Sequence, residues 1–86
     1  MRAKQEVFKN NKKVNERHFS EEKTKNELIN LLIQSHKKQY KTKIHFDHIR
    51  REIKASFTFL HELSNGETNF YKYEYLFNNI TNNIEQ

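Results

Sequence analysis

Hydrophobic positions in the middle of the chain recur at helical spacing. They follow one another at steps of three and four residues: Phe46, Ile49, Ile53, Phe57, Leu60 and Leu63. These steps place one side chain per turn on a single face of an α-helix. Arg50, Arg51 and Lys54 fall on the opposite face of the first half. The pattern predicts a helix over about 45–64, with an apolar ridge turned inward and a basic face turned outward.

The limits of this helix are indicated by turn-forming and capping residues. Asp47 is a candidate cap near its start, because a carboxylate accepts hydrogen bonds from the free amides of a first turn. Ser64-Asn65-Gly66 marks its end. Glycine is the residue best suited to the left-handed conformation just past a helix C-terminus. A turn through 67–69 is expected to follow.

A second apolar cluster predicts a central helix over about 21–38. Ser20 is a good N-cap, and Glu21 and Glu22 complement the helix dipole. The cluster consists of Leu28, Ile29, Leu31, Leu32 and Ile33. At 100° per residue it covers about 200° of the helix circumference, wider than a one-sided stripe. We therefore expect this helix to contact neighbours on more than one side.

The C-terminal segment fits two periods. One set of positions recurs at steps of three and four: Phe70, Tyr73, Phe77, Ile80 and Ile84. This is the seam of a helix over about 69–82. Another set alternates with polar residues or Leu76, as in a strand: Tyr71, Tyr73, Tyr75 and Phe77. The helix is favoured because its pattern is longer.

The segment 40–46 also alternates between apolar and polar residues. This alternation fits a short half-buried strand, or an extended linker into the next helix. The stretch 1–19 shows no sustained period and is read as a flexible basic arm. The prediction is an all-α protein, with a single three-helix domain over 20–86. With 86 residues the chain has room for one small core, and a homodimer is expected because it would enlarge the buried apolar area.

Charge indicates what such a domain would bind. The chain has a formal net charge of +5, and residues 37–54 alone hold seven basic and two acidic side chains. A basic surface of this kind attracts the phosphates of nucleic acid. The expected function is a small regulatory DNA-binding protein, active in transcription regulation. Its candidate nucleic-acid-binding residues are Lys37, Lys38, Lys41, Lys43, Arg50, Arg51 and Lys54.

A near-equal alternative is a protein-binding regulator, such as an inhibitor, adaptor or connector of a partner protein. Aromatic side chains are enriched at protein–protein contacts, and the C-terminal third is acidic, which disfavours a phosphate surface there. The candidate partner or dimer interface comprises Tyr71, Tyr73, Tyr75, Phe77 and Ile80.

Other function classes lack a signature. The sequence has no glycine-rich phosphate loop, nucleophile elbow or paired-carboxylate motif, so we expect no enzyme, cofactor or small-molecule substrate. His45 and His48 lie three residues apart with Glu52 one turn on, but no zinc or iron motif is present, and no metal is expected. The chain has no Cys, no secretory-type N-terminus and no apolar run near the roughly 18 residues of a membrane span. A cytoplasmic location is expected.

Overall fold

The computed structural model describes residues 2–20, 22–36 and 41–80. They form five β-strands and one α-helix. The elements are β1 (Arg2–Lys9), β2 (Lys12–Ser20), α1 (Lys25–Ser35), β3 (Lys41–Asp47), β4 (Glu52–Glu62) and β5 (Thr68–Asn78). The protein is therefore mostly β, and the all-α prediction is wrong.

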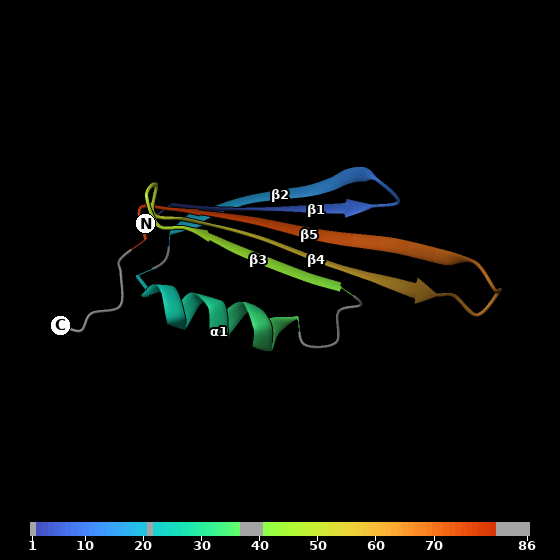
Figure 1. The fold of residues 1–86 in the computed structure, drawn as a ribbon. Coiled ribbons are helices and arrows are strands. Elements are labelled where there is room, and N and C mark those ends of the chain that lie inside the picture. The colour runs from blue at the N-terminus through green and yellow to red at the C-terminus, as the bar shows by residue number, and fades with distance from the viewer. Residues whose placement is uncertain (1, 21, 37–40, 81–86) are drawn as a thin grey trace.

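The strands form one antiparallel sheet in the order β2-β1-β5-β4-β3. Three pairs of neighbours are hairpins, β1–β2, β3–β4 and β4–β5, and β1 and β5 join at the centre (Figure 1). The central β1–β5 pairing connects the first and last strands along the chain. The N-terminal hairpin is thus an integral part of the sheet.

The predicted helix over about 45–64 is instead the end of β3, a turn, and β4. Ile53, Ala55 and Phe57 alternate along β4 and are all buried under α1. A helix would have placed Ile49 and Leu60 on the same buried ridge, yet Ile49 lies in the turn with 84% of its surface exposed and Leu60 is 50% exposed. In a strand, residues two positions apart share a face. Ile53 and Leu60 are seven positions apart, so they lie on opposite faces of β4.

The C-terminal segment follows its strand pattern, and the helix over about 69–82 is wrong. Tyr73, Tyr75 and Phe77 lie on the face of β5 that meets α1, as their alternation requires. The strand alternative for 40–46 corresponds to β3. Both segments are rich in aromatic and β-branched residues, which fit a pleated, half-buried surface.

Residues 2–19 are not a flexible arm but form most of a β-hairpin. Asn10 and Asn11 connect its strands, and both have positive φ, 51° and 67°. Two consecutive left-handed residues define the type I′ turn that suits a two-residue hairpin, and asparagine tolerates this conformation better than most residues.

Helix α1 begins later than predicted and covers one face of the sheet. Thr24 caps it through a capping box with Glu27, so Ser20 is not the cap and the helix does not span 21–38. Leu28 and Leu32 are buried against the sheet, but Leu31 and Ile33 are 42% and 44% exposed. The helix is thus a covering layer with one buried side, not a central helix with several neighbours.

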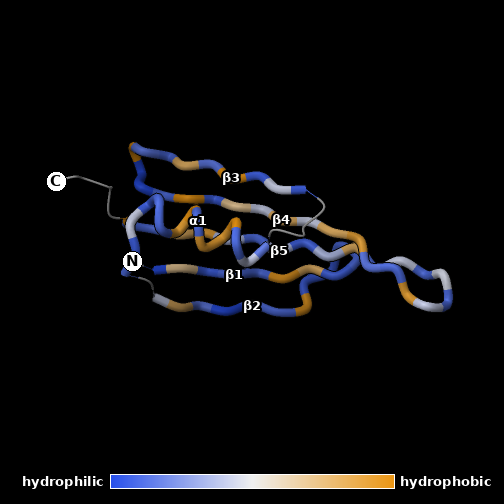
Figure 2. Tube along the Cα trace, turned by 90° about the horizontal axis from the view of Figure 1, so that it is seen from below, coloured by the Kyte–Doolittle hydropathy of each residue, from blue (hydrophilic) through white to orange (hydrophobic). Residues whose placement is uncertain are grey.

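The opposite face of the sheet has no helix over it within the described ranges. Figures 1 and 2 show α1 lying along one side of the sheet, while the β4–β5 hairpin extends well past its end. The side chains at alternate positions of all five strands consequently form a broad open face. This face, rather than a helix surface, holds the candidate site.

Candidate nucleic-acid interface

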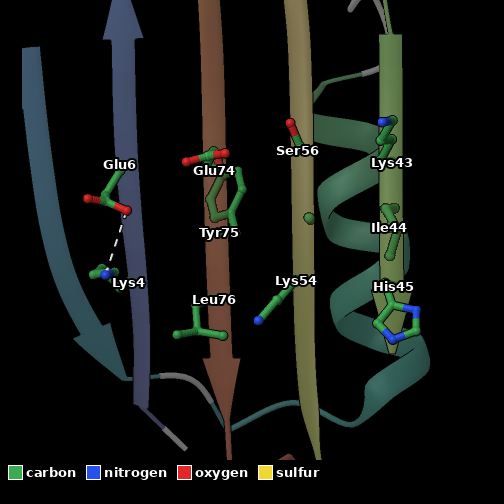
Figure 3. Close-up of a pocket in the computed structure, with 11 residues that line it drawn as sticks. Lys4, Glu6, Lys43, Ile44, His45, Lys54, Ser56, Glu74, Tyr75 and Leu76 are labelled. Carbon is green, nitrogen blue, oxygen red and sulfur yellow. Dashed lines mark ion pairs between the residues drawn. The ribbon is translucent and has the colours of Figure 1, made fainter. Parts of the chain in front are cut away.

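Two adjoining hollows lie on the open face of the sheet. The first, of about 380 Å³, crosses the middle of the sheet, and its lining includes Lys4 of β1, Leu76 of β5, Lys54 of β4 and His45 of β3 (Figure 3). The second, of about 350 Å³, continues toward the projecting end. Lys43 and Ser56 line both hollows, and these two residues are directly opposite each other in the β3–β4 register. We call the two together the open-face groove.

The two carboxylates of the open-face groove are engaged by lysines. Glu6 and Glu74 face each other across β1 and β5, an arrangement that is unfavourable for like charges. The Glu6 carboxylate forms ion pairs with the ammonium groups of Lys4 at 3.6 Å and Lys13 at 3.3 Å. Lys72 Nζ lies 3.2 Å from Glu74. The negative charge on β1 and β5 is therefore locally balanced.

A third carboxylate on the same face is also held. Glu16 of β2 lies 2.6 Å from Lys13 Nζ and 2.7 Å from His18 Nε2. The hydrogen bond from Lys13, and then that from His18, lowers the pKa of Glu16 to about 2. The same contacts with Glu16 and Glu6 raise the pKa of Lys13. These contacts form an ion-pair network along the β1–β2 edge of the sheet.

Three lysines of β3 and β4 differ from those of the network. Among the residues that the structure describes, Lys41, Lys43 and Lys54 form no ion pair, and all three are exposed. Lys41 and Lys43 are two apart on one strand, a spacing of about 6.6–6.8 Å. Lys54 is the diagonal neighbour of Lys43, about 7–8 Å away between Cα atoms. We call these three residues the lysine triad.

The predicted nucleic-acid-binding residues are thus only partly brought together. Lys41, Lys43 and Lys54 share the open face, although on strands and not on a helix. Arg50 and Arg51 lie in the β3–β4 turn, where Arg50 Nε is 3.9 Å from Asp47 Oδ2. The predicted contributions of Lys37 and Lys38 lie outside the described residues.

Asp47, expected to cap a helix, accepts hydrogen bonds in the β3–β4 turn instead. Its Oδ1 accepts hydrogen bonds from the backbone amides of Ile49 and Arg50, each at 3.1 Å. The backbone amide of Arg50 is the main cause of the lowered pKa of Asp47, opposed by desolvation and assisted by the amide of Ile49. An Asx turn and a helix N-cap use the same contact, which explains why the sequence alone indicated the wrong element.

Several residues of the open-face groove were missed from the sequence. Lys4 comes from the segment assigned to a flexible arm, and Lys72 and Phe70 come from the segment assigned to a helix. The signal that could have identified the β5 residues is the alternation of apolar and polar residues in β4 and β5. Once these segments are strands, every second residue must share one face. The β1–β5 pairing that adds Lys4 has no comparable local signal.

The predicted partner or dimer interface lies mostly in the protein core. Tyr75, Phe77 and Ile80 are 9%, 2% and 0% exposed beneath α1. Tyr71 and Tyr73 are half-buried, and both rings stack with Phe59 on the part of β4 and β5 near and beyond the end of the helix. The structure therefore leaves Tyr71 and Tyr73 as the accessible members of this set.

The histidines do not gather with other ligands. In the described part of the chain, no group of three or more His, Cys, Asp or Glu side chains is arranged to hold a metal ion. His45 lies on the open face opposite Lys54, while His48 is in the β3–β4 turn.

No helix among residues 2–20, 22–36 and 41–80 combines the length and apolar character needed to cross a membrane. Comparison with known families, characterised proteins and solved structures gives no significant match for this chain.

Proposed function

We propose that this protein binds nucleic acid along the open-face groove, with the lysine triad contacting the phosphate backbone. The observation that supports this proposal is the arrangement of charge on the groove. Its carboxylates are engaged by Lys4, Lys13 and Lys72, whereas the triad lysines have no ion-pair partner among the described residues.

A polyanion suits this arrangement better than a single small anion. The Cα atoms of the triad lysines are separated by strand and diagonal spacings, so these side chains start from positions distributed along the groove. The groove also crosses four strands, from Lys4 on β1 to His45 on β3. Contacts to the backbone give affinity and position without reading base sequence.

The proposal is tested by removing charge from the groove. Lys43→Ala with Lys54→Ala is expected to weaken binding of a labelled mixed-sequence oligonucleotide. The loss follows from two missing phosphate contacts, each of which lowers the salt slope of log Kd by about 0.7–0.9. Fluorescence anisotropy at two salt concentrations measures both effects.

The matched control is Lys9→Ala with Lys12→Ala. These lysines flank the turn of the β1–β2 hairpin and are exposed. They lie opposite each other in the strand register, on the face of the sheet away from the groove. Both double variants lose two positive charges, so a general charge effect would weaken them equally. Equal weakening, or no binding of any oligonucleotide by the unmodified protein, would overturn the proposal.

A further inference from the structure

The second hollow of the groove ends on an aromatic side chain. Phe70 of β5 lines it together with Lys41, Lys43 and Lys72, and the lining contains no carboxylate. Phe8 of β1 lies beside this hollow, directly opposite Lys72 of β5. The Lys72 ammonium is 5.8 Å from the centre of the Phe8 ring. Positive charge and an aromatic ring thus meet at this end of the groove.

The backbone of Phe70 is fixed by the β1–β2 turn. The Phe70 amide donates to Asn10 Oδ1 at 2.8 Å, and the Asn10 amide donates to the Phe70 carbonyl at 2.7 Å. Asn10 Nδ2 also donates to Asn69 Oδ1 at 3.1 Å. Three hydrogen bonds therefore anchor this part of β5 to the hairpin turn. A platform that is held in place before binding costs less to order when a ligand arrives.

From these contacts, and resting on the proposed function, we infer that the preferred ligand is single-stranded nucleic acid, with an unpaired base stacked on Phe70. Proteins that bind single strands combine a positively charged groove with aromatic side chains on which bases stack. Inside a duplex both faces of each base are covered by neighbouring base pairs. Phe70 can therefore add binding energy only where bases are free.

The chain offers a direct spectroscopic test, because it contains no tryptophan. Phe70→Trp introduces the one tryptophan of the chain at the platform, and with excitation selective for tryptophan over the four tyrosines its emission is expected to be quenched by a 12-nucleotide single strand. The same sequence as a duplex is expected to leave the emission nearly unchanged. Ile33→Trp, on α1 and 44% exposed, lies on the other side of the sheet; it is the control and should show no quenching with either ligand.

Affinity gives an independent measurement. Phe70→Leu is expected to weaken single-strand binding about tenfold, within the range for one base–aromatic stack, while Phe70→Tyr, which keeps the ring, retains it. Circular dichroism establishes that both variants keep the sheet. Duplex binding by Phe70→Leu should match that of the unmodified protein.

The outcomes separate this inference from the proposed function. If the lysine variants weaken binding but duplex and single strand bind equally, or Phe70→Leu has no effect, the stacking inference is wrong and the phosphate-binding proposal stands. If the unmodified protein binds neither form, the proposed function itself fails, and the stacking inference fails with it.

Discussion

At the scale of residues, a series of side-chain hydrogen bonds runs from β2 across β1 and β5 to the end of α1. Arg17 Nε donates to Gln5 Oε1 at 3.3 Å, and Gln5 Nε2 donates to the Tyr75 hydroxyl at 2.8 Å. The hydroxyl proton is then available for His36 Nε2, 2.6 Å away. His36 also stacks on Phe57, with ring centres 4.4 Å apart. Donation from the Tyr75 hydroxyl requires the neutral form of His36 with Nε2 unprotonated.

Burial lowers the pKa of His36 below its ordinary 6.5. Desolvation also raises the pKa of Tyr75, opposed by the hydrogen bond from Gln5. A histidine with a lowered folded-state pKa stabilises the fold fully above pH 6.5. As the pH falls below 6.5, the unfolded chain takes up the proton first, and this stabilisation is lost as the pH passes through the folded-state pKa.

We therefore expect the free energy of unfolding to decrease between pH 7 and pH 5, and to decrease less in His36→Phe. Phenylalanine keeps the stacking on Phe57 but cannot titrate. Urea unfolding at a series of pH values measures the difference, and the four other histidines are present in both proteins. Parallel pH profiles for the two proteins would contradict the role given to His36.

At the scale of elements, the start of α1 is set by a local capping box. Thr24 Oγ1 accepts from the Glu27 amide at 3.4 Å, and Glu27 Oε1 accepts from the Thr24 amide at 2.9 Å. The backbone contact with Thr24 is also the main cause of the lowered pKa of Glu27. Two otherwise unpaired amides of the first turn are satisfied in this way.

Thr24→Ala is expected to reduce the free energy of unfolding by about 1 kcal/mol, the typical cost of losing an N-cap. Ser20→Ala is the informative control, because Ser20 is the cap that the sequence indicated but lies at the end of β2. Thermal or denaturant melts compare the two variants. A larger loss for Ser20→Ala would mean that the helix begins where the sequence analysis placed it.

The elements also show what the sequence could and could not predict. The run from Ile53 to Phe59 alternates apolar and polar residues without interruption, but Ala55 is small, so the larger residues at helical spacing dominated the pattern. Asn10-Asn11 is a hairpin signal that was not recognised. A helix within 21–38 was correctly expected, although it is shorter in the structure, because Leu28, Leu31 and Leu32 follow the i, i+3, i+4 spacing of a helix and do not alternate as in a strand.

The candidate site was predictable in part for the same reason. Lys41, Lys43 and Lys54 were selected by charge alone, and charge does not depend on whether the segment is a strand or a helix. Lys4 and Phe70 required the β1–β5 and β4–β5 pairings. The β1–β5 pairing joins residues about 70 positions apart, and nothing local in either segment encodes its register.

At the scale of the whole molecule, helix α1 makes the two faces of the sheet different. Leu28 and Leu32 complete an apolar core that includes Ile53, Phe57 and Phe77, and none of the described buried residues is polar or charged. The open face carries mainly polar and charged side chains, with Phe8, Phe70 and Leu76 among them. An antiparallel sheet permits this division, because one face can pack on the core while the other meets solvent or a ligand.

The central claim is that nucleic acid lies on the open face and not on the side of α1. Reductive methylation with ¹³C-formaldehyde keeps the charge of every lysine and gives each an NMR signal. On titration with a single-stranded oligonucleotide, the signals of Lys41, Lys43 and Lys54 are expected to shift. The signal of Lys25, which packs over the Phe46 ring at 4.7 Å on the α1 side, should stay in place. Uniform shifts of all lysines, or shifts largest on the α1 side, would contradict the account.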